Sequence, residues 1–178
     1  AYYTKLENYQ KYGIITHAVY DTLIFKKIRA MFGNKIKTVL CASAPMPKNL
    51  ADDFKIFLSI PVIEGLGMTE LSGSAFCTSY YDLTNYTAGG VTGGAKIIIK
   101  SVPDLGYTID DVVEGINCPA GEICIKGPLV FQGYYKNDEE NKKAFDENGY
   151  FHTGDVCRLF PNLGNGIKIV DRVKEIFK

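Results

Sequence analysis

The order of elements predicted in the first part of the chain constrains the fold more than any other feature of this sequence. Short apolar runs predict strands at residues 36–41 and 61–63, and a proline opens the helix predicted between them at 47–58. Strand, loop, helix and strand in this order are typical of a parallel α/β sheet, which binds ligands at the carboxyl ends of its strands. The loops expected at 42–45 and 64–70 follow these strands and are therefore the first candidates for a binding site.

One further helix is predicted upstream of this pattern. Between Ala18 and Phe32 apolar residues recur close to every 3.6 residues, and Gly33-Asn34 is a typical stop signal. His17 stands at the start of this helix, where we expect it to cap or pack rather than to react. The first part of the chain is therefore expected to be an α/β segment.

The sequence changes character at the glycine-rich segment 89–94, after which short apolar runs alternate with turn signals. The runs predict strands at residues 97–100, 122–126, 130–134, 156–160 and 167–170. One helix is expected from Asp138 to Phe145, because acids at its start and lysines near its end suit the helix dipole. The second part of the chain is therefore expected to be β-rich.

Charge and cysteine content narrow the function classes. The chain carries 20 basic and 20 acidic residues, so no strong field favours nucleic acid or an anionic membrane surface. No run approaches the roughly 18 apolar residues of a membrane span. Five cysteines without a CxxC spacing argue against a zinc site and for buried thiols in a reducing compartment. We therefore expect an intracellular, cytoplasmic protein without nucleic-acid partners or a transmembrane segment; membrane association of a longer product stays open.

Two interpretations are open for the segment Gly65-Leu66-Gly67-Met68-Thr69-Glu70. Its glycines let backbone approach a ligand, its threonine hydroxyl suits a phosphate oxygen, and its carboxylate suits Mg²⁺. The same residues also suit a glycine turn with a polar helix start, which is favoured on this segment alone. Glu70 and Asp155 have the side chains of a general acid–base pair, but other roles are expected for them below. His152 is expected to shape the turn Thr153-Gly154-Asp155 rather than to transfer protons.

Five segments together resemble the motifs of one enzyme superfamily. They are Ser43-Ala44-Pro45, Glu64 to Glu70, Gly121 to Tyr135, Tyr150 to Asp155 and Asp171 to Lys178. On these segments the chain is similar to the adenylate-forming superfamily of acyl-CoA synthetases, luciferases and peptide-synthetase adenylation domains. The resemblance implies part of the large N-terminal domain of such an enzyme. It implies an α/β segment of the AMP-binding domain at 1–90, a β-rich subdomain at 91–171 and a hinge at 172–178, with the C-terminal domain absent.

The resemblance also implies where the nucleotide base lies. The loop Ser43-Ala44-Pro45 is expected against the adenine of ATP, and Glu64-Gly65-Leu66-Gly67 is expected to help bind the nucleotide. Leu66 occupies the position of an aromatic residue in the family motif, so aliphatic packing would replace stacking on the base. We expect Leu66 to weaken ATP binding modestly, because aromatic contacts contribute about 1 kcal/mol beyond their buried area. A side chain in place of Gly67 is expected to block an acyl tunnel.

The remaining implied roles concern phosphate, metal, ribose and domain motion. Thr69 and Glu70 are expected to be catalytic, the threonine at the ATP phosphates and the glutamate as a ligand of Mg²⁺. Asp155 and Arg172 are expected to hold the ribose hydroxyls, and Lys174 is the expected hinge. The family's phosphate loop and its catalytic lysine are not in this chain, so we expect these 178 residues alone to be inactive.

Four shorter segments look most like the long-chain fatty-acid branch: Lys5 to Asn8, Ser101 to Asp104, Val130 to Tyr135 and Asp171 to Lys178. The implied function is activation of a long-chain fatty acid with ATP to acyl-AMP, followed by transfer of the acyl group to CoA. Two alternatives remain. One is a fatty-acyl-AMP ligase or another adenylation domain, and the other is a catalytically silent module that binds nucleotide or lipid. The loop near Gly93 is shorter than in the family.

Overall fold

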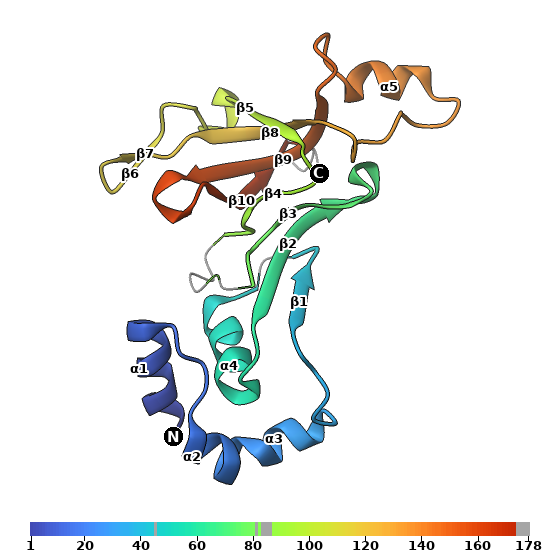
Figure 1. Ribbon diagram of the computed structural model, residues 1–178. Helices are drawn as coiled ribbons and strands as arrows, with labels where there is room; N and C mark the ends of the chain where they lie inside the picture. The colour runs from blue at the N-terminus through green and yellow to red at the C-terminus, as the bar shows by residue number, and fades with distance from the viewer. Residues whose placement is uncertain (45, 81, 83–86, 174–178) are drawn as a thin grey trace. The chain divides into compact units, whose positions relative to one another are not determined.

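The computed structural model describes residues 1–44, 46–80, 82 and 87–173. The chain divides into two compact units, each of which is described by itself (Figure 1). The first unit comprises Ala1–Glu64 and Thr78–Tyr86, and the second comprises Gly65–Cys77 and Thr87–Lys178. The division into residues 1–90, 91–171 and 172–178 that the sequence suggests stays a prediction.

Helices form the N-terminal part of the first unit. They are α1 (Tyr2–Tyr12), α2 (Ala18–Tyr20), the π-helical turn η1 (Asp21–Phe25) and α3 (Lys26–Met31). The last three follow one another without a break and confirm the helix predicted from Ala18. His17 caps this helix, since its imidazole accepts a hydrogen bond from the Tyr20 backbone N–H, as expected. The sequence pattern does not predict α1.

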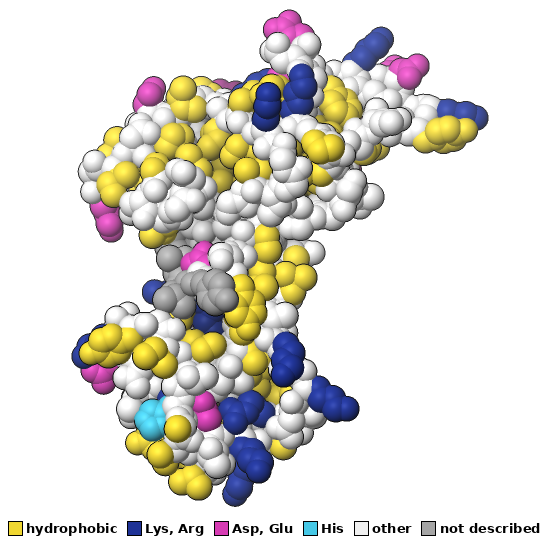
Figure 2. Space-filling view, in the orientation of Figure 1, with side chains coloured by type: hydrophobic (Ala, Val, Ile, Leu, Met, Phe, Trp, Pro, Cys, Tyr) yellow, Lys and Arg dark blue, Asp and Glu magenta, His cyan; other side chains and the backbone are white. Residues whose placement is uncertain are grey.

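Most of the apolar residues that predicted the helix from Ala18 are exposed, and of them only Ile28 packs on the core of this unit. Leu23 and Met31 are largely exposed, and Figure 2 shows hydrophobic side chains on the surface of the first unit. A π-helical turn widens the helix, so a strict 3.6-residue period no longer tells which side chains point inward. Phe25 is buried instead, in a small hydrophobic core with Tyr9 and Ile56.

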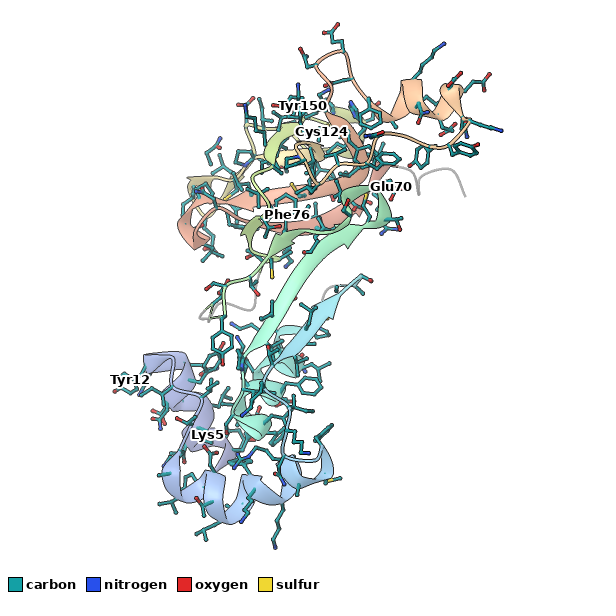
Figure 3. All side chains as sticks on the ribbon, turned by 45° about the vertical axis from the view of Figure 1, so that its right-hand side comes forward. Lys5, Tyr12, Glu70, Phe76, Cys124 and Tyr150 are labelled. Atoms are coloured by element: carbon teal, nitrogen blue, oxygen red, sulfur yellow. The ribbon has the colours of Figure 1, made fainter. Side chains whose placement is uncertain are left out.

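A buried lysine links the helices of the first unit (labelled in Figure 3). The Lys5 ammonium donates to the Asp21 carboxylate at 2.6 Å, to the Ile56 carbonyl oxygen at 2.6 Å and to the Ser59 hydroxyl at 2.8 Å. It also lies 4.5 Å from the centre of the Phe25 ring. Burial lowers the pKa of Lys5, and the hydrogen bond to Asp21 opposes that shift. All three ammonium donors therefore have partners, as a buried charge requires.

The strand–helix–strand pattern predicted from the sequence is present. Strand β1 (Val39–Ala42) leads through a loop to helix α4 (Lys48–Leu58) and then to β2 (Val62–Met68). The strands β1 and β2 are neighbours in the sheet order, and in Figure 1 they run in the same direction. This arrangement confirms the parallel part of the α/β fold expected from the sequence.

The loop expected at residues 64–70 is wrong, because β2 continues to Met68. Its later part pairs antiparallel with β3 (Gly73–Cys77), and β3 pairs with β4 (Gly90–Val91). A single 3₁₀ turn, η2 (Thr69–Leu71), connects β2 to β3. The glycines that suggested a loop have a steric reason inside the strand: a Cβ atom at Gly67 would collide with the Gly73 carbonyl oxygen.

A second sheet, antiparallel throughout, dominates the second unit. Its order is β10 (Gly166–Arg172), β9 (Phe151–Phe160), β8 (Ala120–Lys126) and β5 (Lys96–Lys100). The other elements are β6 (Val112–Val113), β7 (Ile116–Asn117), α5 (Asp138–Ala144) and the 3₁₀ turns η3 (Pro103–Leu105) and η4 (Pro161–Leu163). Four of the five strands predicted after the glycine-rich segment are confirmed, and so is the helix near Asp138.

The fifth predicted strand, at residues 130–134, is wrong. Phe131 instead places its ring 5.6 Å from the ring of Phe145 and 5.2 Å from that of Phe151, measured between centroids. These rings pack on a core that includes Ile123, Ile125 and Ile167. Apolar residues give the same sequence signal in a packed loop as in a strand, so the pattern alone does not separate the two.

The buried thiols expected from the sequence are found at three of the five cysteines. All five cysteines are free thiols; Cys118, Cys124 and Cys157 are buried, whereas Cys41 and Cys77 are half-buried. Among the described residues, no helix is both long and apolar enough to cross a membrane.

Candidate functional site

The expected ribose motif lies at an irregularity in strand β9. Glu122 of β8 pairs with Val156, and Cys124 pairs with His152. Two steps along β8 therefore correspond to four steps along β9 (124 − 122 against 156 − 152), so β9 contains two extra residues. We call the segment 153–155 the β9 bulge. Bulges of this kind disrupt a ladder locally and redirect side chains, and they are frequent beside active sites.

Local hydrogen bonds define the shape of the β9 bulge. The Thr153 hydroxyl donates to the Ile123 carbonyl oxygen at 2.8 Å and accepts from the Asp155 backbone N–H at 3.1 Å. Gly154 has a φ of +76°, in the left-handed region where a side chain is strained. The glycine therefore allows the chain to turn just before the Asp155 carboxylate.

Asp155, at the end of the bulge, lies beside Arg172, as the expected shared role at a ribose requires. Arg172 of β10 lies opposite Asp155 in the strand register, and its Nε donates to the carboxylate Oδ1 at 2.9 Å. The Asp155 side chain is only 5% exposed, whereas that of Arg172 is 56% exposed. The Arg172 guanidinium thus holds the Asp155 carboxylate, whose oxygens can accept several hydrogen bonds.

Glu70 is held by a residue that the sequence analysis did not single out. The Tyr134 hydroxyl donates to the Glu70 Oε1 at 2.9 Å, and the Phe131 backbone N–H donates to the Glu70 carbonyl oxygen at 2.8 Å. Burial, followed by the bond to Glu70, raises the pKa of Tyr134. Figure 3 labels Glu70 near the end of β2, and the neighbouring Thr69 is exposed. The Gly-Tyr-Tyr sequence at 133–135 carries the signal for Tyr134, but only as part of a motif.

The residues expected around the adenine fall mostly in the first unit. Ser43 has a φ of +71° and lies with Ala44 in the exposed loop after β1, and Pro45 lies outside the described residues. Glu64 is half-buried in β2. Burial raises the pKa of Glu64, while a hydrogen bond from the Met46 backbone partly opposes the shift. Within this unit the structure therefore brings Glu64 to the loop that follows β1.

The other expected residues have mixed outcomes. Gly65, Leu66 and Gly67 lie inside strand β2, and Leu66 packs against the core of the second unit. The expected hinge residue Lys174 lies outside the described residues.

A pocket of about 360 Å³ in the first unit is lined by side chains that include Asp21 and Arg29. Of the expected site residues that the structure describes, none lines that pocket.

Comparisons with known proteins identify the family. The family described as AMP-binding enzyme matches residues 7–135, more than half of the chain, and the chain belongs to this family. Long chain acyl-CoA synthetase 7, peroxisomal, from Arabidopsis thaliana is 34% identical over 166 residues, which cover 93% of this chain and 23% of that protein. Long-chain-fatty-acid–CoA ligase 5 from Mus musculus is 36% identical over 172 residues, which cover 96% of this chain and 24% of that protein.

Solved structures agree with this assignment. The adenylation domain of a carboxylic acid reductase from Segniliparus rugosus, in complex with AMP and a co-purified carboxylic acid, matches with a TM-score of 0.69 and 27% identity. The match covers 99% of this chain and 26% of that one. The corresponding domain from Mycobacterium chelonae matches with a TM-score of 0.67 and 30% identity, over 99% of this chain and 25% of that one. The chain thus has the α/β fold of part of an adenylate-forming enzyme, and it spans about a quarter of the length of the curated relatives that it matches.

Proposed function

We propose that this chain is part of an AMP-forming ligase that activates long-chain fatty acids and transfers them to CoA. The observation that carries the proposal is the buried Asp155 carboxylate, which the β9 bulge presents beside Arg172. The similarity to long-chain acyl-CoA synthetases over more than nine-tenths of the chain supports the choice of substrate class. The proposed substrates are a long-chain fatty acid, ATP and CoA.

In this proposal Asp155 and Arg172 bind the ribose of ATP. The Asp155 carboxylate accepts hydrogen bonds from both vicinal hydroxyls, and Arg172 orients it. These residues position the nucleotide and do not react with it, so their contribution is to proximity and orientation. Ser43, Ala44, Pro45 and the segment Glu64 to Gly67 are proposed to contact the adenine side of the nucleotide.

Thr69 and Glu70 are proposed to act at the phosphates. An exposed hydroxyl and a half-buried carboxylate are the oxygen donors that Mg²⁺ prefers, and the Glu70 carboxylate keeps acceptor capacity beyond its bond from Tyr134. The residues present therefore fit a divalent cation. Bound Mg²⁺ supplies charge neutralisation on the phosphate oxygens during adenylation. Tyr134 holds Glu70 in place for this role.

The proposed reaction has two half-reactions. In the first, a fatty-acid carboxylate oxygen attacks the α-phosphorus of ATP; the bond to the β-phosphate oxygen breaks, and acyl-AMP and pyrophosphate form. In the second, the CoA thiolate attacks the acyl carbonyl and AMP leaves. Lys174 is proposed as the pivot of the domain motion between the two steps, which is a form of conformational gating.

Two other proposals compete with this one. The structural match to adenylation domains of carboxylic acid reductases favours, as a second candidate, an enzyme that forms acyl-AMP but uses another acyl acceptor. A module that binds nucleotide or lipid without turnover is the third. We propose an intracellular, cytoplasmic location, and the names of some relatives add the peroxisome as an alternative.

The test uses the full-length gene product that carries this chain. It is incubated with palmitate, ATP, Mg²⁺ and CoA, and acyl-CoA, AMP and pyrophosphate are measured. We expect all three in equal amounts. Acyl-AMP without acyl-CoA would favour the second candidate, and ATP binding without any pyrophosphate would favour the silent module.

A further inference from the structure

Glu122 of β8 lies opposite the β9 bulge and bonds it at two points. Its Oε1 accepts from the Gly154 backbone N–H at 3.0 Å, and its Oε2 bonds the His152 Nδ1 at 2.8 Å. The Glu122 side chain is only 14% exposed. The bonded groups, in His152 and Gly154, lie just upstream of Asp155. The Glu122 carboxylate of β8 therefore fixes the backbone path of β9.

The neighbours of His152 indicate which of its two ring nitrogens carries the hydrogen. Its Nε2 lies 3.3 Å from the Lys100 Nζ, and that ammonium also donates to the Asp146 carboxylate at 2.7 Å. An ammonium group has only donors, so Nε2 is the acceptor. Nδ1 then carries the hydrogen and donates it to Glu122. The hydrogen bonds therefore run from Lys100 to Asp146 and His152, and from His152 to Glu122.

A metal site is the competing explanation of this cluster. Ligand atoms of Glu122, Cys124 and His152 lie within 4.8 Å of one another. The Lys100 ammonium beside His152 opposes a second cation, and the Nδ1 hydrogen occupies the position that a metal would need. Burial raises the pKa of the Cys124 thiol to about 12, which keeps the sulfur protonated. Hydrogen bonding accounts for the cluster more fully than metal binding does.

We propose that Glu122 is a positioning residue for the ribose-binding carboxylate Asp155, an inference that rests on the proposed function. The Gly154 amide has left the regular β8–β9 ladder, and without Glu122 it would lack this acceptor, so the bulge would move to other conformations. Glu122 acts through the backbone of residues 153–155, and His152 holds its second oxygen.

The test compares ATP with 2′,3′-dideoxy-ATP, which lacks the hydroxyls that Asp155 is proposed to bind. Affinities for both nucleotides are measured by calorimetry on the full-length gene product and its variants. We expect the unmodified protein to prefer ATP by about tenfold or more, as charge-assisted hydrogen bonds imply. Asp155→Asn should abolish the preference. Glu122→Gln should reduce it by at least about threefold, because one amide oxygen cannot accept from both Gly154 and His152. The double variant should show no loss beyond that of Asp155→Asn, because both act on one interaction.

Controls separate positioning from general damage. Glu139→Gln makes the same change at an exposed position of α5 and should leave the preference unchanged. A change that only loosens the fold would weaken both nucleotides equally, and that result for Glu122→Gln would overturn the proposal. If Glu122→Gln does not fold, His152→Phe replaces it: the phenyl ring should lower the preference, and His152→Gln, which restores a donor, should recover part of it. No change in His152→Phe would count against the proposal in the same way.

Different results would disprove the ribose assignment of the proposed function and the positioning role of Glu122. If Asp155→Asn keeps the full preference for ATP, the ribose assignment is wrong and the role of Glu122 falls with it. If Asp155→Asn loses the preference and Glu122→Gln retains it, only the positioning role is wrong. Zinc binding that Glu122→Gln abolishes, measured by calorimetry with ZnCl₂ alone, would favour the metal site and overturn the hydrogen-bond account.

Discussion

Tyr134 and Glu70 are joined by a hydrogen bond of 2.9 Å from the phenol to the carboxylate Oε1, although 64 positions of sequence separate them. The bond ties the 3₁₀ turn after β2 to the loop before α5. It orients the carboxylate that is proposed to bind Mg²⁺ and leaves acceptor positions on that carboxylate for other donors or a cation. Each step of the proposed adenylation that uses Glu70 therefore depends on a tyrosine outside the motif that contains Glu70.

The first prediction concerns this tyrosine. Tyr134→Phe removes the hydroxyl and keeps the packed ring, so we expect normal folding and a Glu70 carboxylate that is less well oriented. The Mg²⁺ concentration for half-maximal pyrophosphate release should rise about threefold to tenfold, as loss of one hydrogen bond to a charged group implies. Tyr135→Phe, at a side chain that is 87% exposed, is the matched control. An unchanged Mg²⁺ requirement in Tyr134→Phe would remove the proposed role.

The second prediction separates the two half-reactions. Glu70→Gln should slow formation of acyl-AMP far more than transfer of a preformed acyl-AMP to CoA, because the metal is needed only while pyrophosphate leaves. A loss of about a hundredfold in the first half-reaction and less than threefold in the second is expected, in line with the loss of one charge-stabilising group. Single-turnover assays of each half-reaction measure it. Equal losses in both would show that Glu70 does not bind the metal of adenylation.

The third prediction distinguishes binding from folding at Asp155. Asp155→Asn keeps a side chain of the same size that still accepts from Arg172, so the melting temperature should stay close to that of the unmodified protein. ATP affinity should fall by about tenfold or more, since charge-assisted hydrogen bonds are worth about 1.5–3 kcal/mol. Calorimetry and thermal unfolding give the two values. A large fall in melting temperature with unchanged ATP affinity would make Asp155 a structural residue.

The fourth prediction concerns acid stability at Asp146. The hydrogen bond from Lys100 and those from the Tyr150 and Asn148 backbones lower the pKa of Asp146 to about 2. A carboxylate with a depressed folded pKa contributes stability above its unfolded pKa of about 3.9, and that contribution is lost as the pH falls towards 2. Asp146→Asn should therefore lose less stability between pH 5 and pH 2 than the unmodified protein does. Urea unfolding at both pH values measures this, with the exposed Asp110→Asn as control.

The fifth prediction tests the steric role of Gly67. Gly67→Ala places a Cβ atom on the Gly73 carbonyl oxygen of the paired strand, and backbone cannot move aside as a flexible side chain can. We expect the free energy of unfolding to fall by about 1–3 kcal/mol, as for overpacked sites. Gly90→Ala, where no atom lies within 4 Å of the added Cβ, should change it by less than about 0.5 kcal/mol. Equal effects at the two glycines in urea unfolding would contradict the steric explanation.

Some elements followed from local sequence and others did not. The pattern β1–α4–β2 was predictable because apolar runs flank an amphipathic helix opened by a proline. Helix α1 was not, since it buries Lys5, whose role depends on Asp21 and Ser59 farther along the chain. Residues 64–68 carry glycines that signal a turn, but the close approach of β3 is what requires Gly67.

The candidate site shows the same division. The resemblance implied roles for Asp155 and Arg172, and their direct contact depends on the register of three strands. Glu122 and Tyr134 belong to recognisable motifs, but nothing in their local sequence reveals that one bonds the β9 bulge and the other bonds Glu70. Contacts between distant segments are tertiary facts, and periodicity reports only which face of an element is apolar.

Where β8 and β9 pair around the β9 bulge, β9 contains two residues more than β8. A β9 shortened by two residues would run beside β8 without interruption and would need no glycine in the left-handed region. Such a protein would have the more regular sheet, and the Asp155 carboxylate would no longer project beside Arg172. A regular sheet and the proposed recognition of a nucleotide thus place opposite demands on the same few positions.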